Sequence, residues 1–294
     1  MWVMKMLFWH GRSSTGKKVN NFTQRTITGI VFVIIMVASI VIHPFVFGAL
    51  FLIVTILGML EFYRLVQAGN IRPDLIAGLT GGILLYGIVF LIAAGFLGYQ
   101  WLYTLLAIIP LIAVKELFAG SPQPFSNIAF TLMGVVYIAL PLSLLNCYYA
   151  PGQFSHEPDF AFLLGFFIIL WLTDTGAYLL GKATGRHLLF PRISPKKTWE
   201  GIAGGLLAGI LAAWGLSRFF PQLSLTGWIM MAILIILFGT LGDLVESMMK
   251  RSVQVKDSGS LLPGHGGILD RFDGVLLASP VVFIYLYTLL TIKQ

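Results

Sequence analysis

The sequence contains little charge. Charged residues make up 11% of its 294 residues, whereas 57% are hydrophobic. Soluble domains are typically about 25% charged, and in this chain apolar runs of about twenty residues, the length that crosses a bilayer, recur from end to end. These runs exclude a soluble globular fold and indicate a polytopic membrane protein.

Cysteine and histidine are also scarce. The single cysteine, Cys147, excludes an intramolecular disulfide and a Cys-rich metal site. The four histidines other than His265, which is discussed below, show no metal-ligand spacing. Internal repeats and low-complexity tracts are absent as well. The chemistry of this chain must therefore be sought among its few charged residues.

The apolar runs predict an all-α transmembrane helical bundle. Inside hydrocarbon the backbone must satisfy its own hydrogen bonds, and long apolar segments without strict alternation favour helices over a β-barrel. We expect nine spans, because the hydrophobic pattern repeats nine times. They cover residues 26–42, 45–63, 75–97, 100–118, 126–147, 160–181, 201–219, 227–248 and 274–292.

The basic residues indicate the orientation. With a cytoplasmic N-terminus, nine spans leave only Arg218 and Lys293, of 19 Lys and Arg residues, on the outside. This asymmetry follows the positive-inside rule. The net charge of +7 then reflects topology and attraction to anionic lipids, and we exclude nucleic-acid binding because the spans separate the basic loops.

The chain is expected to form one membrane domain after a short leader. Residues 1–25 are interpreted as a cytoplasmic or membrane-surface segment, too short in its apolar part and too poorly followed by small residues for a cleaved signal peptide. Residues 26–294 form the integral-membrane domain, with the N-terminal spans in 26–150 and the chemistry in 151–294.

Asp174, Asp243 and Glu246 are acidic residues in or at the edge of predicted spans. A carboxylate at the bilayer centre costs about 2.5–3.5 kcal/mol, so it normally faces an interior cavity and marks a site. Asp243 and Glu246 lie three residues apart on one helix face, and Lys250 follows on the same face. Glu246 is interpreted either as an ion-pair partner of Lys250 or as part of the site.

Asp270 and Asp273 repeat the three-residue spacing at the mouth of the last span. If that helix starts near Ile268, both carboxylates point the same way and suit Mg²⁺, which binds one or two carboxylates together with substrate phosphate oxygens. The alternative is a charged interfacial cap in which Arg271 pairs locally.

Two loops carry features of phosphate-binding sites. The segment P-G-H-G-G at 263–267 surrounds His265 with glycines, which let backbone N–H groups approach an anion, so we expect His265 to contact substrate. In the segment 192–201, Ser194 followed by Pro195 resembles an N-cap with proline at the first helical position. Lys196 and Lys197 would then lie at a helix N-terminus that attracts phosphate, although two such lysines also commonly serve only to fix topology.

Carboxylates and cations are thus predicted to converge on the cytoplasmic half of the bundle. Anionic reactants held there with Mg²⁺ indicate phosphoryl or nucleotidyl transfer onto a lipid.

The same residues resemble the phosphatidate cytidylyltransferase (CDP-diacylglycerol synthase) family. Its signature is similar to the segment 247–273, and the stretches from Asp174 and Ser194 resemble two further family motifs, so the likeness covers the C-terminal half. The signature positions are Ser247, Met249, Lys250, Arg251, Lys256, Asp257, Gly259, Leu262, Pro263, His265, Gly266, Gly267, Asp270, Arg271 and Asp273.

The resemblance implies an Mg²⁺-dependent bacterial inner-membrane enzyme that joins CTP to phosphatidic acid, with its site on the cytoplasmic side. It also implies a homodimer and a potassium ion near the magnesium. Asp243, Asp270 and Asp273 would hold metal, and Lys250 and His265 would be catalytic. The expected substrate-binding residues are Ser194, Lys196, Lys197, Thr198, Ser247, Arg251, Lys256, Asp257, Gly266, Gly267, Arg271, Asp174 and Glu246.

Two rival functions fit the sequence less well. A CDP-alcohol phosphotransferase needs two further spaced aspartates after its first pair, but no aspartate follows Asp273. An ion-coupled transporter would distribute charges along a pathway to both faces, whereas Glu157 and Asp159 are the only acids in the outer loops.

Overall fold

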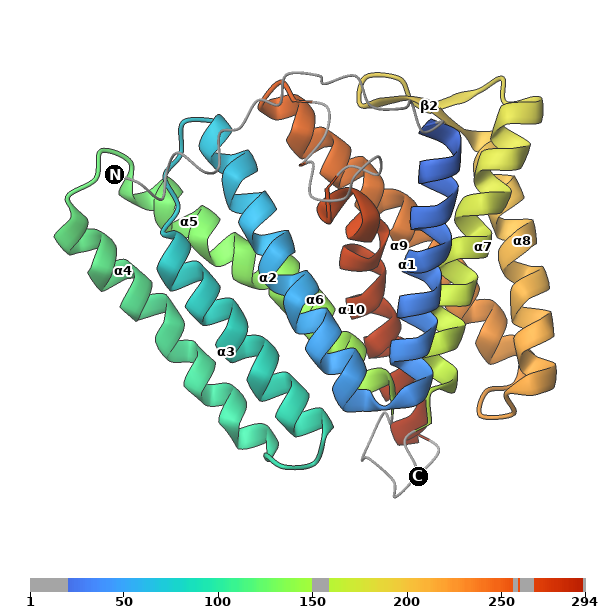
Figure 1. The fold of residues 1–294 in the computed structure, drawn as a ribbon, viewed down its shortest axis with the longest axis horizontal. Helices are drawn as coiled ribbons and strands as arrows, with labels where there is room; N and C mark the ends of the chain where they lie inside the picture. The colour runs from blue at the N-terminus through green and yellow to red at the C-terminus, as the bar shows by residue number, and fades with distance from the viewer. Residues whose placement is uncertain (1–20, 150–158, 256–258, 260–266, 293–294) are drawn as a thin grey trace.

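The computed structural model describes residues 21–149, 159–255, 259 and 267–292, and most of them are helical. Figure 1 shows the helices packed side by side as a bundle. The elements are α1 Asn21–Ile42, α2 Pro44–Ala68, α3 Leu75–Ala93, η2 Tyr99–Ala107, α4 Ile108–Ala119, α5 Pro124–Gly134, the π-helical turn η3 Val135–Ala139, α6 Leu140–Leu144, η4 Leu145–Tyr149, α7 Ala161–Thr184, β1 Leu188–Phe190, β2 Ser194–Thr198, α8 Trp199–Phe219, α9 Leu225–Ser252 and α10 Leu269–Ile292.

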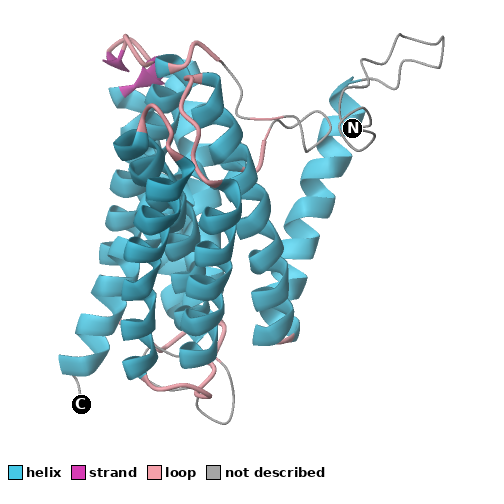
Figure 2. Ribbon diagram, turned by 90° about the vertical axis from the view of Figure 1, so that its left-hand side faces the viewer, coloured by secondary structure: helices cyan, strands magenta, loops and turns pink. Residues whose placement is uncertain are grey.

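Eight helical segments of the described chain are long and apolar enough to cross a membrane. They run from α2 to α10 and coincide with eight of the nine predicted spans. The ninth prediction corresponds to α1, whose described apolar stretch, Gly29–Ile42, is shorter. These findings confirm the all-α polytopic class. In Figures 1 and 2 the start of α1 and the end of α10 lie at opposite ends of the bundle.

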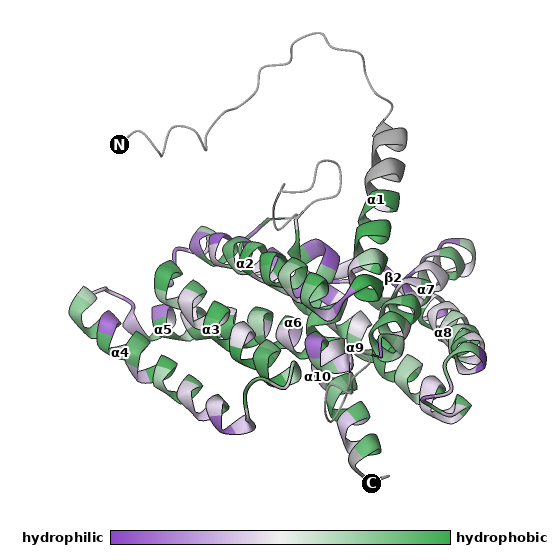
Figure 3. Cartoon of the chain, turned by 60° about the horizontal axis from the view of Figure 1, so that its bottom comes forward, coloured by the Kyte–Doolittle hydropathy of each residue, from purple (hydrophilic) through white to green (hydrophobic). Residues whose placement is uncertain are grey.

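The outer surface of the bundle is apolar. Leu117 and Phe118 at the end of α4 are 75% and 85% exposed, and Phe125 at the start of α5 is 87% exposed. In Figure 3 green, hydrophobic residues predominate along α3, α4 and α8. Monomeric soluble proteins rarely expose continuous apolar surface on this scale. The exposed side chains therefore match a hydrocarbon environment.

A single hydrophobic cluster joins the helices, and buried tyrosines tie distant spans together. It includes residues from Met36 in α1 to Leu286 in α10. Tyr148 donates its hydroxyl to the carbonyl of Ser279 in α10 at 2.7 Å. Such hydrogen bonds between spans stabilise membrane bundles because hydrocarbon offers no alternative partner. The N-terminal and C-terminal spans are therefore held in one packed unit.

A short hairpin precedes α8 and corrects the prediction for Ser194. β1 and β2 are antiparallel, with Leu188 opposite Thr198 and Phe190 opposite Ser194. Ser194 is therefore in a strand and does not cap a helix. Thr198 is the N-cap instead, since its hydroxyl accepts the N–H of Gly201 at 3.1 Å. Pairing with β1 keeps the Ser-Pro segment extended, so the helix begins four residues later than expected.

An ion pair fixes the start of α3 to the end of α4. Lys115 Nζ lies 2.5 Å from Asp74 Oδ2, and Asp74 also caps α3 by accepting the N–H of Ala77 at 3.0 Å. Partial burial opposes ionisation, but the hydrogen bond from Ala77 and the nearby Lys115 hold the pKa of Asp74 below its usual value. The carboxylate therefore stays ionised at neutral pH and keeps its cap.

Candidate functional site

Charged side chains from α7, β2, α9 and α10 gather in two groups at the end of the bundle that carries the hairpin. The first, here called the accessible cluster, consists of Asp174, Lys197, Asp243 and Asp273. The second, the buried cluster, consists of Glu246, Lys250 and Asp270. Intramembrane charges of this kind normally pair with one another and mark a site.

Lys197 and Asp243 form the centre of the accessible cluster. Lys197 Nζ lies 2.6 Å from Asp243 Oδ2, while Ser247 donates its hydroxyl to Asp243 Oδ1 at 3.2 Å. Asp174 and Asp273 both interact electrostatically with Lys197 and Asp243. Three carboxylates thus share one lysine, and the cluster is negative overall. Its chemistry suits a further cation.

This cluster remains open to ligands. The side chain of Asp243 is 38% exposed and that of Lys197 is 25% exposed, and Asp174 is also exposed. Asp273 is half-buried, and the N–H of Gly274 donates to its Oδ1 at 2.7 Å. The accessible cluster therefore offers carboxylate oxygens and a lysine ammonium group that a phosphorylated or metal-bound ligand can contact directly.

Local sequence explains how these side chains meet. Successive strand residues point to opposite sides, so in β2 Lys197 reaches α9 while Lys196 is exposed to solvent. Between α9 and α10, the missing side chain of Gly242 leaves room for the carbonyl of Asp273, which a Cβ would strike. Close approach of the two helices brings Asp243 and Asp273 into one cluster.

In the buried cluster, one lysine bridges two carboxylates. Lys250 Nζ lies 2.5 Å from Glu246 Oε2 and 2.6 Å from Asp270 Oδ1. Glu246 is 1% exposed, and the side chains of Lys250 and Asp270 are 12% and 15% exposed. The N–H of Gly267 donates to Asp270 Oδ2 at 2.9 Å. The predicted ion pair between Glu246 and Lys250 is therefore confirmed, with Asp270 as an additional partner.

The structure gives Asp270 and Asp273 different partners. Both lie in the first turns of α10, three residues apart, as predicted. Asp270 binds Lys250, whereas Asp273 belongs to the accessible cluster. Across the described ranges no group of three or more His, Cys, Asp or Glu side chains is arranged to hold a metal ion.

The remaining predicted site residues fall into three groups. Lys196, Arg251 and Arg271 are exposed near the clusters, and Thr198 is buried as the cap of α8. Lys256, Asp257, His265 and Gly266 lie outside the described residues, so their predicted contacts with substrate stay predictions.

Sequence reasoning missed Glu61 in α2. Its side chain is 1% exposed, and its Oε2 accepts the N–H of Leu269, the first residue of α10, at 3.0 Å. Its Oε1 has no hydrogen-bond partner among the described residues and faces Gly259. An acid inside the predicted span 45–63 was the available signal, because buried carboxylates in membranes are costly.

Tyr137 in η3 was also missed. Its hydroxyl is buried without a hydrogen-bond partner in the part of the chain that the structure describes. It interacts electrostatically with Glu246 and Asp273. A tyrosine in an apolar span gives no sequence signal of its own, since tyrosine is common in membrane helices.

Comparison with known proteins shows what this chain is similar to. The model of the cytidylyltransferase family matches residues 23–289. The chain is 44% identical over 164 residues to a phosphatidate cytidylyltransferase of Staphylococcus aureus (strain COL), a match covering 55% of this chain and 60% of that protein. The proteins of the same name from Staphylococcus haemolyticus and Staphylococcus saprophyticus give the same identity and coverage. The match thus spans about 60% of the length of these relatives.

Proposed function

The chain belongs to the cytidylyltransferase family, and we propose on this basis that it transfers the cytidylyl group of CTP to phosphatidic acid, releasing CDP-diacylglycerol and pyrophosphate. The named relatives are phosphatidate cytidylyltransferases. The observation that carries the proposal is the accessible cluster, in which carboxylates and a lysine meet at one end of an apolar bundle. A water-soluble nucleotide and the phosphate of a membrane lipid can both reach a cluster at the end of an apolar bundle.

The proposed reaction is an in-line displacement at phosphorus. An oxygen of the lipid phosphate attacks the α-phosphorus of CTP, the bond from that phosphorus to the bridging oxygen of the β-phosphate breaks, and pyrophosphate leaves. The lipid phosphate is already ionised near neutral pH, so no strong general base is required. Positioning and charge neutralisation supply most of the acceleration. Lys197, with the exposed Lys196, Arg251 and Arg271, provides cations for these phosphates.

The oxygen donors in the two clusters suit Mg²⁺, which prefers carboxylates and phosphate oxygens. Asp243 and Asp270 each have a carboxylate oxygen 2.6 Å from a lysine ammonium, so both already bind a cation. On the family resemblance, Asp243, Asp270 and Asp273 would hold Mg²⁺, with a second cation such as K⁺ nearby. Asp270 is paired with Lys250 in the buried cluster, so joining the other two carboxylates would require it to leave that lysine. When bound, Mg²⁺ would neutralise charge on the transferring phosphoryl oxygens.

We place this chemistry on the cytoplasmic side of a bacterial plasma membrane. The end of the bundle that carries both clusters also carries the last turn of α7, the hairpin and the last turn of α9 (Figure 1). These described segments contain Lys182, Arg192, Lys196, Lys197, Lys250 and Arg251, and the positive-inside rule assigns that end to the cytoplasm. CTP is then available from the aqueous phase, while phosphatidic acid arrives from the inner leaflet. The family resemblance supports a homodimer, which cross-linking in membranes would test.

A labelled-nucleotide assay tests the proposal. Purified full-length protein in detergent micelles with dioleoyl phosphatidate and Mg²⁺ should move label from [α-³²P]CTP into lipid and release one pyrophosphate per labelled lipid. [γ-³²P]CTP should leave the lipid unlabelled, because the β- and γ-phosphates depart together. Absence of labelled lipid would reject the function. Release of CMP from CDP-diacylglycerol and an alcohol would instead support the rival phosphotransferase.

Glu61 is expected to act as a positioning residue for this reaction. Glu61→Ala removes the acceptor for the Leu269 N–H and should lower turnover about 10- to 100-fold, as loss of a supporting contact does at other sites. Glu61→Gln keeps an acceptor oxygen and should restore most of the activity. The comparison requires initial rates and melting temperatures of both variants. Wild-type rates in Glu61→Ala, or equal losses in both variants, would contradict this role.

A further inference from the structure

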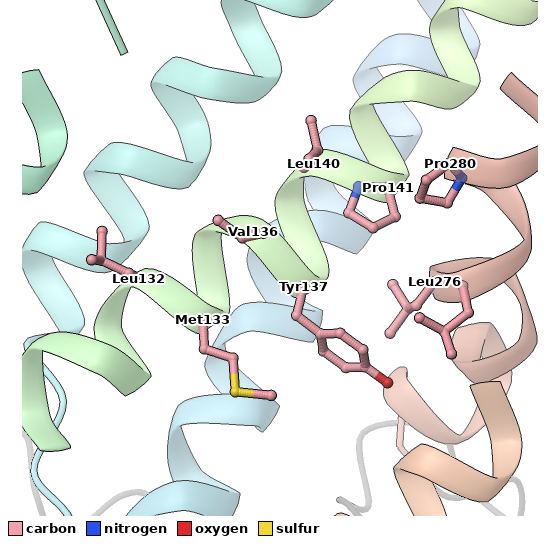
Figure 4. A pocket seen from close by; sticks show the side chains of 9 residues that line it. Leu132, Met133, Val136, Tyr137, Leu140, Pro141, Leu276 and Pro280 are labelled. Atoms are coloured by element: carbon pink, nitrogen blue, oxygen red, sulfur yellow. The ribbon is translucent and has the colours of Figure 1, made fainter. Parts of the chain in front are cut away.

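An apolar cavity of about 480 Å³ lies between the α5–η3–α6 span and α10. Met133 and Leu140 line one wall, and Leu276, Leu277 and Pro280 line the other (Figure 4). Its volume falls within the roughly 300–1,000 Å³ of small-molecule sites. None of its lining residues belongs to the accessible or the buried cluster.

The cavity reaches the lipid-facing surface of the bundle. Val136, one of its lining residues, is 57% exposed, whereas Leu276 on the opposite wall is 1% exposed. The lining therefore extends from the membrane surface to the core. A molecule dissolved in the bilayer can enter it sideways.

The inner end of the cavity meets the charged clusters. On α10, Leu276, Leu277 and Pro280 follow Asp273 by three, four and seven residues, so all four share one helix face. From the other wall, Tyr137 reaches across toward α10 in Figure 4. Its buried hydroxyl has no partner among the described residues and interacts electrostatically with Asp273 and Glu246. Since buried hydroxyls are nearly always hydrogen-bonded, this one calls for a ligand.

We propose that this cavity, a groove open to the membrane, holds an acyl chain of phosphatidic acid, with the Tyr137 hydroxyl donating a hydrogen bond to an oxygen at the polar end of the lipid. The inference rests on the proposed function and adds to it the route by which the lipid reaches the site. An apolar groove whose inner end carries a hydrogen-bond donor beside carboxylates fits an amphiphilic lipid whose head group lies at the accessible cluster. The π-helical turn that carries Tyr137 is a device frequent at functional sites.

A protein helix is a poorer occupant. One helical turn, ~10 Å across and ~5.4 Å long, already takes up about the whole cavity. A docked span would contact the groove over one turn and leave its other turns without a matching surface. A lipid chain, being thinner and flexible, fills the groove along its length.

Filling the groove should change the chain-length preference of the enzyme. In Val136→Trp, kcat/KM for dioleoyl phosphatidate should fall about tenfold, while the value for dihexanoyl phosphatidate and the KM for CTP stay unchanged. Val114→Trp is the matched control, since Val114 is 51% exposed on α4, away from the groove. Equal losses with both lipids, or no loss, would overturn the inference. So would a changed oligomeric state with unaltered lipid preference, which would assign the groove to a second copy of the chain.

Tyr137→Phe separates the head contact from the tail contact. It should lower kcat/KM for both lipids about five- to tenfold, the effect of one lost hydrogen bond, with no change in chain-length preference. Wild-type kcat/KM values in Tyr137→Phe would show that the hydroxyl does not bind the lipid.

Photolabelling keeps the inference testable even if the variants fold poorly. Wild-type protein is irradiated with phosphatidate carrying a diazirine near the end of one acyl chain, with and without excess dioleoyl phosphatidate. Competed labelling within residues 132–141 and 276–280 supports the groove, and labelling confined to α4 or other outer faces overturns it. Because the label reports binding alone, it distinguishes failure of the groove from failure of the proposed reaction, which the CTP assay detects separately.

Discussion

Replacing Asp243 with Asn is expected to reduce cytidylyl transfer about 10²- to 10³-fold, the usual effect of removing one preorganised electrostatic contact, with little loss of stability. The substitution keeps the shape of the side chain but leaves Lys197, 2.6 Å away, beside a neutral amide. The same change lowers the affinity of this position for a divalent cation, because the amide carries no net charge. Because the side chain is 38% exposed, water can solvate the released lysine.

The measurement is the initial rate of label transfer from [α-³²P]CTP at saturating substrates, with the melting temperature recorded in parallel. Asp74→Asn is the matched control, since Asp74 also pairs with a lysine, Lys115, but lies outside both clusters. That control should remain close to wild type in rate. An Asp243→Asn enzyme within twofold of the wild-type rate would remove Asp243 from the site.

Lys250→Met should lower the free energy of unfolding by about 3–5 kcal/mol, the range for breaking a buried ion pair from one side. Lys250 neutralises Glu246, which is 1% exposed, and Asp270, which is 15% exposed. Without the ammonium group, the two carboxylates lose the cation that they share, although Asp270 keeps the hydrogen bond from the Gly267 N–H. The variant should also be inactive, because Asp270 loses the partner that orients it beside the site.

A double variant distinguishes the two effects. Glu246→Gln combined with Lys250→Met removes one of the two buried carboxylate charges. The double variant should recover a large part of the free energy of unfolding but stay inactive. Denaturant titration in micelles measures the free energies, and Lys182→Met, at an exposed lysine of α7, is the control. Full activity in the stable double variant would show that the buried cluster has only a structural role.

The helical spans could be predicted because their cause is local. Each span is an apolar run bounded by polar residues, and the bilayer enforces backbone hydrogen bonding within it. The pairing of Glu246 with Lys250 was likewise predictable, since residues four apart on a helix are neighbours. The helix cap predicted at Ser194 was wrong because this segment pairs with another strand. Hydrogen bonding to β1 holds it extended up to Thr198.

The partners of the charged residues could not be derived in the same way. Asp243 has no basic residue within reach on its own helix, and its partner Lys197 comes from β2. Glu61 accepts a hydrogen bond from a residue 208 positions later. No periodicity along the chain encodes such contacts, because they depend on how whole helices pack.

The amino-acid order alone determined that this chain is an all-helical membrane protein, which residues carry its charge and which family it resembles, since hydrophobicity and motif spacing act over a few turns. Tertiary structure decided that the carboxylates divide into an accessible and a buried cluster, that Glu61 and Tyr137 join them, and that an apolar groove ends beside them. Close packing of α9 against α10, where Gly242 meets the Asp273 carbonyl, brings these distant groups within reach of one another.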